Sequence, residues 1–209
     1  MASVFGFSEV LLSQEFDAAT QREFLTIIYE QSERMSNILN ELLDLARIEA
    51  RRGKDFHYAR VCLQELAGDL IKAFKLPAGR ALPELVMPVL PLFVMADAGK
   101  LRQALLNVLS NAYKYSPAGG SVIFKIEVGV DAGSPRQVCI HITDQGIGMT
   151  PEQLDRVCER FYRADTSGKI AGTGLGMSIV KEIIELHCGH ITMTSSIGQG
   201  TQVSLCLPG

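Results

Sequence analysis

Apolar residues recur every three or four positions along residues 20–51, which predicts one long amphipathic helix. The stripe has the spacing of a bundle seam, and all but one of its positions are apolar: Ile28, Gln31, Met35, Ile38, Leu42 and Leu45. Thr20 and Glu23 have the pattern of a capping box. The apolar pattern of residues 2–12 predicts the end of an earlier helix. We therefore expect a helical hairpin that dimerises into a four-helix bundle; the alternative is a single core helix in a monomer.

A charged hinge at residues 51–55 ends this helical pattern, and helices and strands then follow without strict alternation. Helices are predicted near residues 63–75, 100–115, 151–160 and 175–188. Strands are predicted near residues 92–97, 121–130, 137–144, 190–196 and 201–207, with turn residues at 131–136 and at Gly198 and Gly200. This order predicts an α+β fold in which helices cover one face of a sheet. We expect two domains, residues 1–52 and 56–209.

Composition narrows the class of protein. The chain is 47% hydrophobic and 21% charged with a formal charge of −3, as expected for a globular protein that does not bind nucleic acid or membranes. The longest apolar run, residues 83–96, is interrupted by prolines, and the N-terminus has no basic segment of a signal peptide, so we expect a cytoplasmic location. A membrane attachment before residue 1 is compatible with this expectation. Five dispersed cysteines predict free thiols in a reducing compartment and no disulfide framework or zinc site: Cys62, Cys139, Cys158, Cys188 and Cys206.

Three polar clusters interrupt the hydrophobic pattern, and the first lies on the helix predicted near residues 100–115. Asn107 and Asn111 are four residues apart, so they share one face, and Lys114 lies on the same edge. Asparagine oxygens suit Mg²⁺, which takes few protein ligands and keeps phosphate oxygens and waters. A solvated helix face would explain this cluster equally well.

The second cluster is DQGIGM, residues 144–149, at the end of a predicted strand. A carboxylate only accepts hydrogen bonds, so Asp144 can bind an exocyclic amine such as that of adenine. Gly146 and Gly148 would let a flat base or sugar lie against the backbone. Taken alone, this stretch is more often a turn than a site.

The third cluster is GTGLGM, residues 172–177, at the start of the last predicted helix. Glycines that lead into a helix N-terminus expose backbone N–H groups and form an anion-binding nest. The Gly-x-Gly-x-Gly spacing and the polar loop before it argue against a dinucleotide-binding Rossmann motif. The sequence also contains no P-loop motif and neither of the protein-kinase triplets His-Arg-Asp and Asp-Phe-Gly.

Taken in order, the three clusters resemble the ATP-binding domain of bacterial sensor histidine kinases, in the superfamily that includes gyrase, MutL and the heat-shock chaperone ATPases. Residues 107–117 resemble the N box and residues 144–149 the first glycine box of that family. Residues 159–165 resemble the F box and residues 172–191 the second glycine box. Residues 1–52 resemble the end of the dimerisation and histidine-phosphotransfer hairpin, so the resemblance covers essentially the whole chain.

This resemblance implies an α/β sandwich with a mixed, mostly antiparallel sheet, and it implies a role for each matching residue. Asn111 would bind Mg²⁺, and Asn107 and Lys114 would lie near the phosphates. Asp144 would bind the adenine amino group and Tyr115 would pack beside the ring. The other residues implied in ATP binding would shape the pocket, cradle the phosphates or edge the lid: Gly146, Gly148, Arg163, Gly172, Thr173, Gly174, Leu175, Gly176 and Thr201.

The resemblance also implies a mobile lid over residues 163–173, which Phe161 would anchor by packing its ring. The acceptor histidine of the family, and the acidic base beside it, would lie about two helical turns before Ala2. We therefore expect this chain not to phosphorylate itself. The histidines present match no acceptor position, and we expect structural roles for them: His57, His141, His187 and His190.

The implied function is that of an ATP-dependent protein histidine kinase that uses ATP and Mg²⁺. It would act as a homodimer, transfer phosphate to a histidine in trans and supply the receiver domain of a response regulator. One alternative is a pseudokinase or scaffold that binds nucleotide and a partner without phosphotransfer. Another is a gyrase- or MutL-like ATPase, which needs a glutamate just before Asn107, where residues 102–106 contain no carboxylate.

Overall fold

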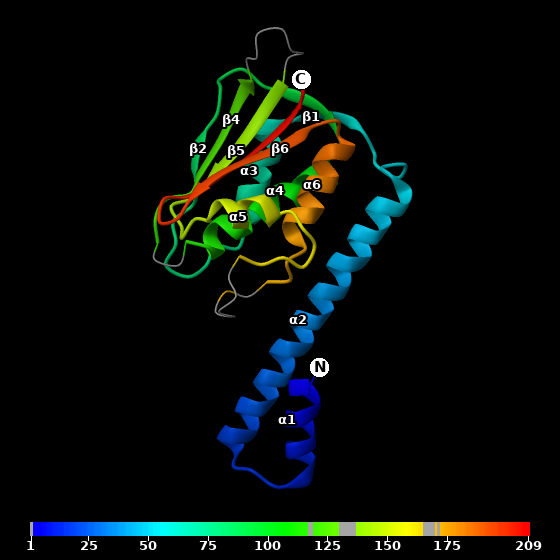
Figure 1. Cartoon of the computed structure of the whole chain (residues 1–209), viewed down its shortest axis with the longest axis vertical. Helices are drawn as coiled ribbons and strands as arrows, with labels where there is room; N and C mark the ends of the chain where they lie inside the picture. The colour runs from blue at the N-terminus through cyan, green and yellow to red at the C-terminus, as the bar shows by residue number, and fades with distance from the viewer. Residues whose placement is uncertain (1, 117–118, 130–136, 165–169, 171) are drawn as a thin grey trace. The chain divides into compact units, whose positions relative to one another are not determined.

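A computed structural model describes residues 2–116, 119–129, 137–164, 170 and 172–209. The chain divides into two compact units, residues 1–46 and 47–209 (Figure 1). The first unit contains helix α1 (Ala2–Ser13) and most of helix α2 (Ala18–Arg51). The ring of Phe24 packs against Phe7 and Phe16, at centroid distances of 5.1 and 5.2 Å. These contacts hold the two helices together as a hairpin, as predicted.

The start of α2 differs from the prediction. The carboxylate of Asp17 accepts hydrogen bonds from the backbone N–H groups of Ala19 and Thr20, at 2.9 and 3.0 Å. The Thr20 hydroxyl donates to the same carboxylate at 2.7 Å. The helix therefore begins at Ala18, and the capping box predicted at Thr20 is wrong because a carboxylate three residues earlier already accepts from the first free N–H groups.

The second unit is built on a five-stranded sheet with the strand order β2-β4-β5-β7-β6. Its strands are β2 (Glu84–Val86), β4 (Ile123–Gly129), β5 (Gln137–Thr143), β6 (His190–Ser196) and β7 (Gly200–Pro208). The β2–β4 pair is parallel and the other pairs are antiparallel, so the predicted mixed, mostly antiparallel sheet is confirmed. A separate antiparallel pair joins β1 (Ala59–Cys62) and β3 (Phe93–Ala96).

Helices cover one face of this sheet, and the core lies between the two layers (Figure 1). They are α3 (Leu63–Ala73), α4 (Ala98–Lys114), α5 (Pro151–Arg156) and α6 (Gly176–Leu186). Alternate residues of β5 point into the core, where Val138, Ile140 and Ile142 are at most 2% exposed. Helices α4 and α6 pack against each other. The α+β sandwich is confirmed; the turn predicted at residues 131–136 lies outside the described residues.

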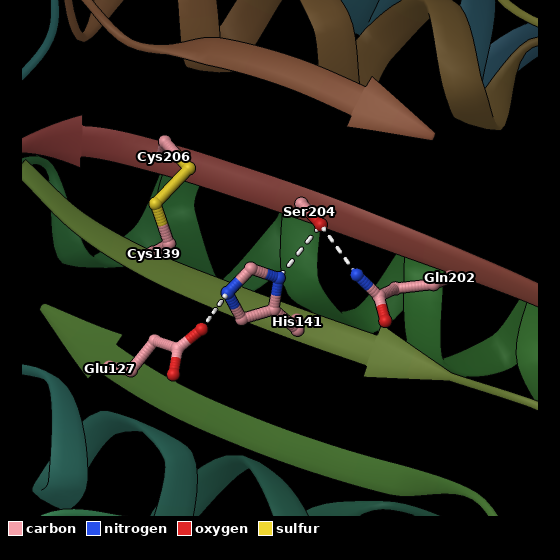
Figure 2. The surroundings of a disulfide bond; sticks show 6 residues. All are labelled: Glu127, Cys139, His141, Gln202, Ser204 and Cys206. Carbon is pink, nitrogen blue, oxygen red and sulfur yellow. Dashed lines mark hydrogen bonds and ion pairs between the residues drawn. A yellow bond between two sulfur atoms is a disulfide. The ribbon is translucent and has the colours of Figure 1, made fainter. Parts of the chain in front are cut away.

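The opposite face of the sheet carries a disulfide bond between Cys139 and Cys206 (Figure 2). These residues are direct partners in the β5–β7 register, with Cα atoms 4.1 Å apart. The prediction of free thiols is therefore wrong for this pair, because antiparallel pairing brings together two cysteines that are 67 residues apart in the sequence. The other three cysteines are free: Cys62, Cys158 and Cys188.

Polar side chains beside the disulfide form a row of close polar contacts across three strands (Figure 2). The Glu127 carboxylate lies 3.1 Å from Nε2 of His141, and Nδ1 of His141 lies 2.7 Å from the Ser204 hydroxyl. Gln202 donates to the same hydroxyl at 3.4 Å, and Lys125 pairs with Glu127 at 2.5 Å. The helix-free face is thus polar where the covered face is apolar. In the described part of the chain, no helix is both long enough and apolar enough to cross a bilayer.

Candidate functional site

The candidate site includes Asp144, which directly follows β5. Its side chain is 7% exposed, and Oδ1 accepts hydrogen bonds from the Gly146 N–H at 2.7 Å and the Ser116 hydroxyl at 3.5 Å. Burial raises the pKa of the Asp144 carboxyl above its ordinary value, and hydrogen bonds from Gly146, Thr201 and Ser116 oppose this rise. A buried carboxylate of this kind gains most from an additional donor such as an amine.

Gly146 and Gly148 allow the backbone after Asp144 to pass very close to its neighbours. A Cβ atom at Gly146 would collide with the carbonyl of Tyr115, and one at Gly148, where φ is 66°, would collide with the carbonyl of Ser196. The Ile147 N–H donates to the Tyr115 carbonyl at 3.0 Å. The two glycines thus let residues 144–148 join the end of α4 to the β6–β7 hairpin.

Thr201 and Ser195 support this loop from the hairpin side. The Thr201 carbonyl accepts the Asp144 N–H at 2.9 Å. Its hydroxyl lies 2.9 Å from the Ser195 hydroxyl, which also accepts the Met149 N–H at 2.9 Å. Thr201 therefore holds the backbone that carries Asp144.

Helix α4 carries the first polar cluster to the same region as the glycine-rich segment. The Asn107 amide donates to the Gly176 carbonyl at 3.4 Å, and a Cβ atom at Gly172 would lie 2.8 Å from Nζ of Lys114. Asn111 is half-buried one turn beyond Asn107 on the same face of the helix. The structure thus brings the first and third clusters together.

The end of α4 connects this polar edge to Asp144. Nζ of Lys114 lies 5.9 Å from the centre of the Tyr115 ring. The Tyr115 carbonyl in turn holds the loop after Asp144 through Ile147. Tyr115 therefore lies between the residues predicted near the phosphates and those predicted near the base.

The glycine-rich segment leads into α6, which begins at Gly176. The Leu175 side chain is fully buried, and the Leu175 N–H donates to the Thr173 hydroxyl at 3.1 Å. A part for Leu175 in nucleotide binding is therefore limited to its backbone. The carbonyl of Gly174 accepts the Phe161 N–H at 2.9 Å, which ties this segment to the predicted F box.

Phe161 does not anchor a lid by packing its ring, as the sequence had suggested. The ring is 59% exposed, and the backbone is left-handed with φ 63°, an uncommon conformation for a bulky side chain. The backbone hydrogen bond to Gly174 makes the connection in its place. Arg163 donates to the Ile170 carbonyl across the base of the predicted lid. Residues 165–169 and 171 of that lid lie outside the described residues.

A metal ion at this site would have to be bound by amide oxygens of the protein and by oxygens of a bound ligand. Among the described residues, no three His, Cys, Asp or Glu side chains gather in a way that could hold a metal ion. Asn111 offers a neutral amide oxygen, and phosphate oxygens and waters would have to complete the shell of an ion such as Mg²⁺. The residues present fit a metal that arrives with a phosphate ligand.

Ser116 and Arg80 support the site and were not predicted. Ser116 is buried and donates to the Ala112 carbonyl at 2.7 Å as well as to Asp144. The Arg80 guanidinium donates to the Ser116 carbonyl and, at 3.2 Å, to the Gly120 carbonyl, so it caps the end of α4. Ser116 could have been inferred from its place after Tyr115, whereas nothing near Arg80 in the sequence points to this role.

Comparison with known proteins agrees with this geometry. Residues 96–209 match the family model of histidine kinase-, DNA gyrase B-, and HSP90-like ATPases, and residues 1–51 match the His Kinase A (phospho-acceptor) domain. The sensor histidine kinase WalK of Bacillus subtilis is 34% identical over 190 residues, which cover 88% of this chain and 30% of the relative. The histidine protein kinase DivJ of Caulobacter vibrioides is 33% identical over 212 residues, which cover 99% of this chain and 34% of the relative.

Solved structures show the same arrangement of elements. Full-length ShkA, crystallised in complex with AMPPNP, has a TM-score of 0.72 at 27% identity and covers 99% of this chain and 42% of that chain. The histidine kinase AdeS of Acinetobacter baumannii has a TM-score of 0.72 at 20% identity, covering 98% of this chain and 92% of that chain, which shows the fold alone. The chain spans about a third of the length of WalK and DivJ. The first family model matches more than half of the chain, which therefore belongs to the histidine kinase-, DNA gyrase B- and HSP90-like ATPases, in the branch of the sensor histidine kinases.

Proposed function

We propose that this chain binds Mg-ATP and transfers the γ-phosphoryl group to a histidine side chain of another polypeptide. The observation that carries the proposal is the meeting of three clusters in one region: Asp144 after β5, the polar edge of α4 and the glycine-rich start of α6. Each cluster has the chemistry of one part of ATP, namely the base, the metal-bound phosphates and the terminal phosphate oxygens.

Asp144 would bind the adenine amino group. Its buried carboxylate accepts hydrogen bonds from protein donors on Oδ1, and it can accept one more hydrogen bond from the amino group of a base. Gly146 and Gly148 would let the base lie against the loop without a side chain in the way. Tyr115, at the end of α4, would lie beside the base. Thr201 would keep Asp144 in place through its carbonyl.

The phosphates would lie between the edge of α4 and the start of α6. Asn107 and Lys114 already approach Gly176 and Gly172, so a phosphate chain held there would meet backbone N–H groups, an ammonium group and the N-terminal end of a helix. Asn111 would hold Mg²⁺, which neutralises charge on the transferred phosphoryl group. The remaining pocket residues would cradle the phosphates or form the lid: Arg163, Thr173, Gly174 and the backbone of Leu175.

The acceptor would be a histidine on a separate chain or outside these residues. Residues 1–51 match the phospho-acceptor domain model but contain no histidine. We propose that the α1–α2 hairpin pairs with a second hairpin, and that the phosphoryl group passes on to the receiver domain of a response regulator. The complete set of three clusters favours this function over a scaffold that binds nucleotide without phosphotransfer.

Labelling in trans tests the proposal. The chain is incubated with γ-labelled ATP, Mg²⁺ and a separate hairpin that carries the acceptor histidine, and acid-labile, base-stable label on that hairpin is expected. Asn111→Ala should abolish labelling, because the metal ligand is lost. Ser110→Ala, on the exposed side of the same helix, is the matched control and should label normally. Equal labelling by Asn111→Ala and the parent, or label on the chain alone, would contradict the proposal.

A further inference from the structure

His187 is a buried titratable residue at the opposite end of α6 from the nucleotide site. It is 4% exposed, and its ring packs against the rings of Phe56 and Tyr58 at centroid distances of 5.3 and 5.2 Å. Its hydrogen bonds connect α6 to the start of α4, the two helices that carry the predicted phosphate-binding residues.

The hydrogen bonds of His187 require one protonation state. Nδ1 lies 2.7 Å from the Ile183 carbonyl, which can only accept, so Nδ1 carries the proton. Nε2 accepts the backbone N–H of Asp97 at 2.9 Å, so Nε2 must be without a proton. The structure therefore contains the neutral imidazole in a single tautomer.

Asp97 is the N-cap residue directly before α4. One oxygen of its carboxylate accepts the Lys100 N–H at 2.9 Å and caps the helix, and the other accepts the His57 N–H at 2.8 Å. The bond from Asp97 to His187 thus ties the N-terminal end of α4 to the C-terminal end of α6. At the other end of α6, its first residue Gly176 accepts a hydrogen bond from Asn107 in the middle of α4, at 3.4 Å. Both ends of α6 are therefore joined to the antiparallel helix α4.

We propose that His187 is a positioning residue for nucleotide binding, which as a neutral imidazole fixes α6 lengthwise against α4 and so holds the glycine-rich segment in place. This inference rests on the proposed nucleotide site. A helix of 11 residues is rigid along its axis, so a displacement at His187 is transmitted to Gly176. Asn107 and the phosphate-binding backbone would then no longer face each other as they do here.

The arrangement couples nucleotide binding to a proton. If Nε2 gained a proton, two donors would face each other at Asp97, and the bond between the helices would be lost. Among the described residues, the titratable groups beside the ring are the Asp97 carboxylate, directly before α4, and the Tyr58 hydroxyl, which donates to Leu186. The Cys188 thiol is exposed and acts on Tyr58. Burial lowers the pKa of His187 below its ordinary value of 6.5, and the hydrogen bond to the Ile183 carbonyl and the Asp97 charge oppose this shift. Nucleotide should therefore bind the neutral form and release a proton in mildly acidic solution.

The test compares the full chain with two variants. His187→Gln keeps an acceptor near the position of Nε2 but cannot be protonated in this range, and His187→Phe keeps the packing of the ring but removes the acceptor. Binding of a non-hydrolysable ATP analogue with Mg²⁺ is measured by calorimetry from pH 5.5 to 7.5, with thermal unfolding to confirm that each variant is folded. His190→Gln, on the exposed outer face of β6, is the matched control.

We expect the parent to lose about threefold more affinity than His187→Gln between pH 7.5 and pH 5.5, because a ring whose pKa in the free protein lies below 6.5 is only partly protonated at pH 5.5. His187→Phe should bind about tenfold more weakly than the parent at pH 7.5, and His190→Gln should behave like the parent. Protonation of the analogue and of Asp144 affects all the proteins alike, so the difference isolates His187. If the parent and both His187 variants bind with the same affinity and pH profile, the inference is wrong while the proposed nucleotide site stands; if the parent does not bind the analogue at all, the proposed function fails first.

Discussion

At the scale of single residues, Asp144 has opposite effects on the nucleotide-free and nucleotide-bound protein. Without a ligand, burial of its charge costs free energy, which is why its pKa is raised. With adenine in place, the same charge would strengthen a hydrogen bond to the amino group. One substitution can therefore separate the two effects.

Asp144→Asn should weaken nucleotide binding, because an amide presents a neutral acceptor to the base. The expected loss is about 1.5–3 kcal/mol, the usual strength of a hydrogen bond to a charged group. Calorimetric titration with a non-hydrolysable ATP analogue measures this loss. Ser204→Ala, in the polar row on the opposite face of the sheet, is a control that should bind like the parent. Unchanged affinity in Asp144→Asn would remove Asp144 from the account of adenine binding.

The same variant should stabilise the nucleotide-free protein at neutral pH. Because the folded-state pKa of Asp144 is raised above its ordinary value of 3.8, the folded protein binds more protons than the unfolded chain just above that value. The free energy of unfolding of the parent therefore decreases as the pH rises through this window, and Asp144→Asn lacks that decrease. Urea unfolding from pH 4 to 7 measures the two curves. A parent curve parallel to that of the variant would show that burial of this charge is not costly.

At the scale of elements, Gly148 and Gly198 offer a matched pair. Both have positive φ, 66° and 73°, but a Cβ atom at Gly148 would collide with the Ser196 carbonyl whereas one at Gly198 would meet nothing within 4 Å. Gly198→Ala should lower the free energy of unfolding by about 1 kcal/mol, and Gly148→Ala should lower it by more than Gly198→Ala does. Chemical denaturation measures both, and equal losses would mean that the close approach of the loop to β6 is not needed for stability.

The elements that the sequence predicted well are those whose signals are local. The stripe on α2 and the alternation in β5 follow from period alone, and the helices and strands of the second unit lie where the pattern placed them within a few residues. The short strands β1 and β2, of four and three residues, were not predicted. Their pairing partners are distant in sequence, so only the assembled sheet defines them.

The residues of the candidate site also fall into those that a local sequence pattern predicts and those that it does not. Asp144, Asn107 and the glycines stand out locally because they break a hydrophobic pattern. Arg80 and the Cys139–Cys206 bond depend on long-range contacts and strand register, which no local pattern contains. The exposed ring of Phe161 illustrates the same limit, since an apolar residue in a sequence motif predicts packing that the folded backbone does not provide.

At the scale of the whole molecule, α2 presents apolar side chains that we expect a second copy to cover. Leu39 and Leu43 are 58% and 55% exposed, which is unusual for neighbouring leucines on one helix. Ile38→Asp should shift the chain toward monomer in sedimentation over a concentration series, because a carboxylate would enter the seam. Ser36→Asp, at an exposed position nearby, should leave the distribution unchanged. A parent that stays monomeric at the highest concentration would contradict pairing through this helix.

The polar row on the helix-free face of the sheet has a consequence for solubility. A sheet with one bare face can stack on another sheet, and stacking requires that the buried groups give up water. Between Lys125 and Gln202 the row consists of charged, imidazole, hydroxyl and amide groups that are already in contact with one another. Pressing a second sheet onto them would dehydrate an ion pair and return no new hydrogen bonds. We therefore expect the row to oppose face-to-face stacking of this sheet on another.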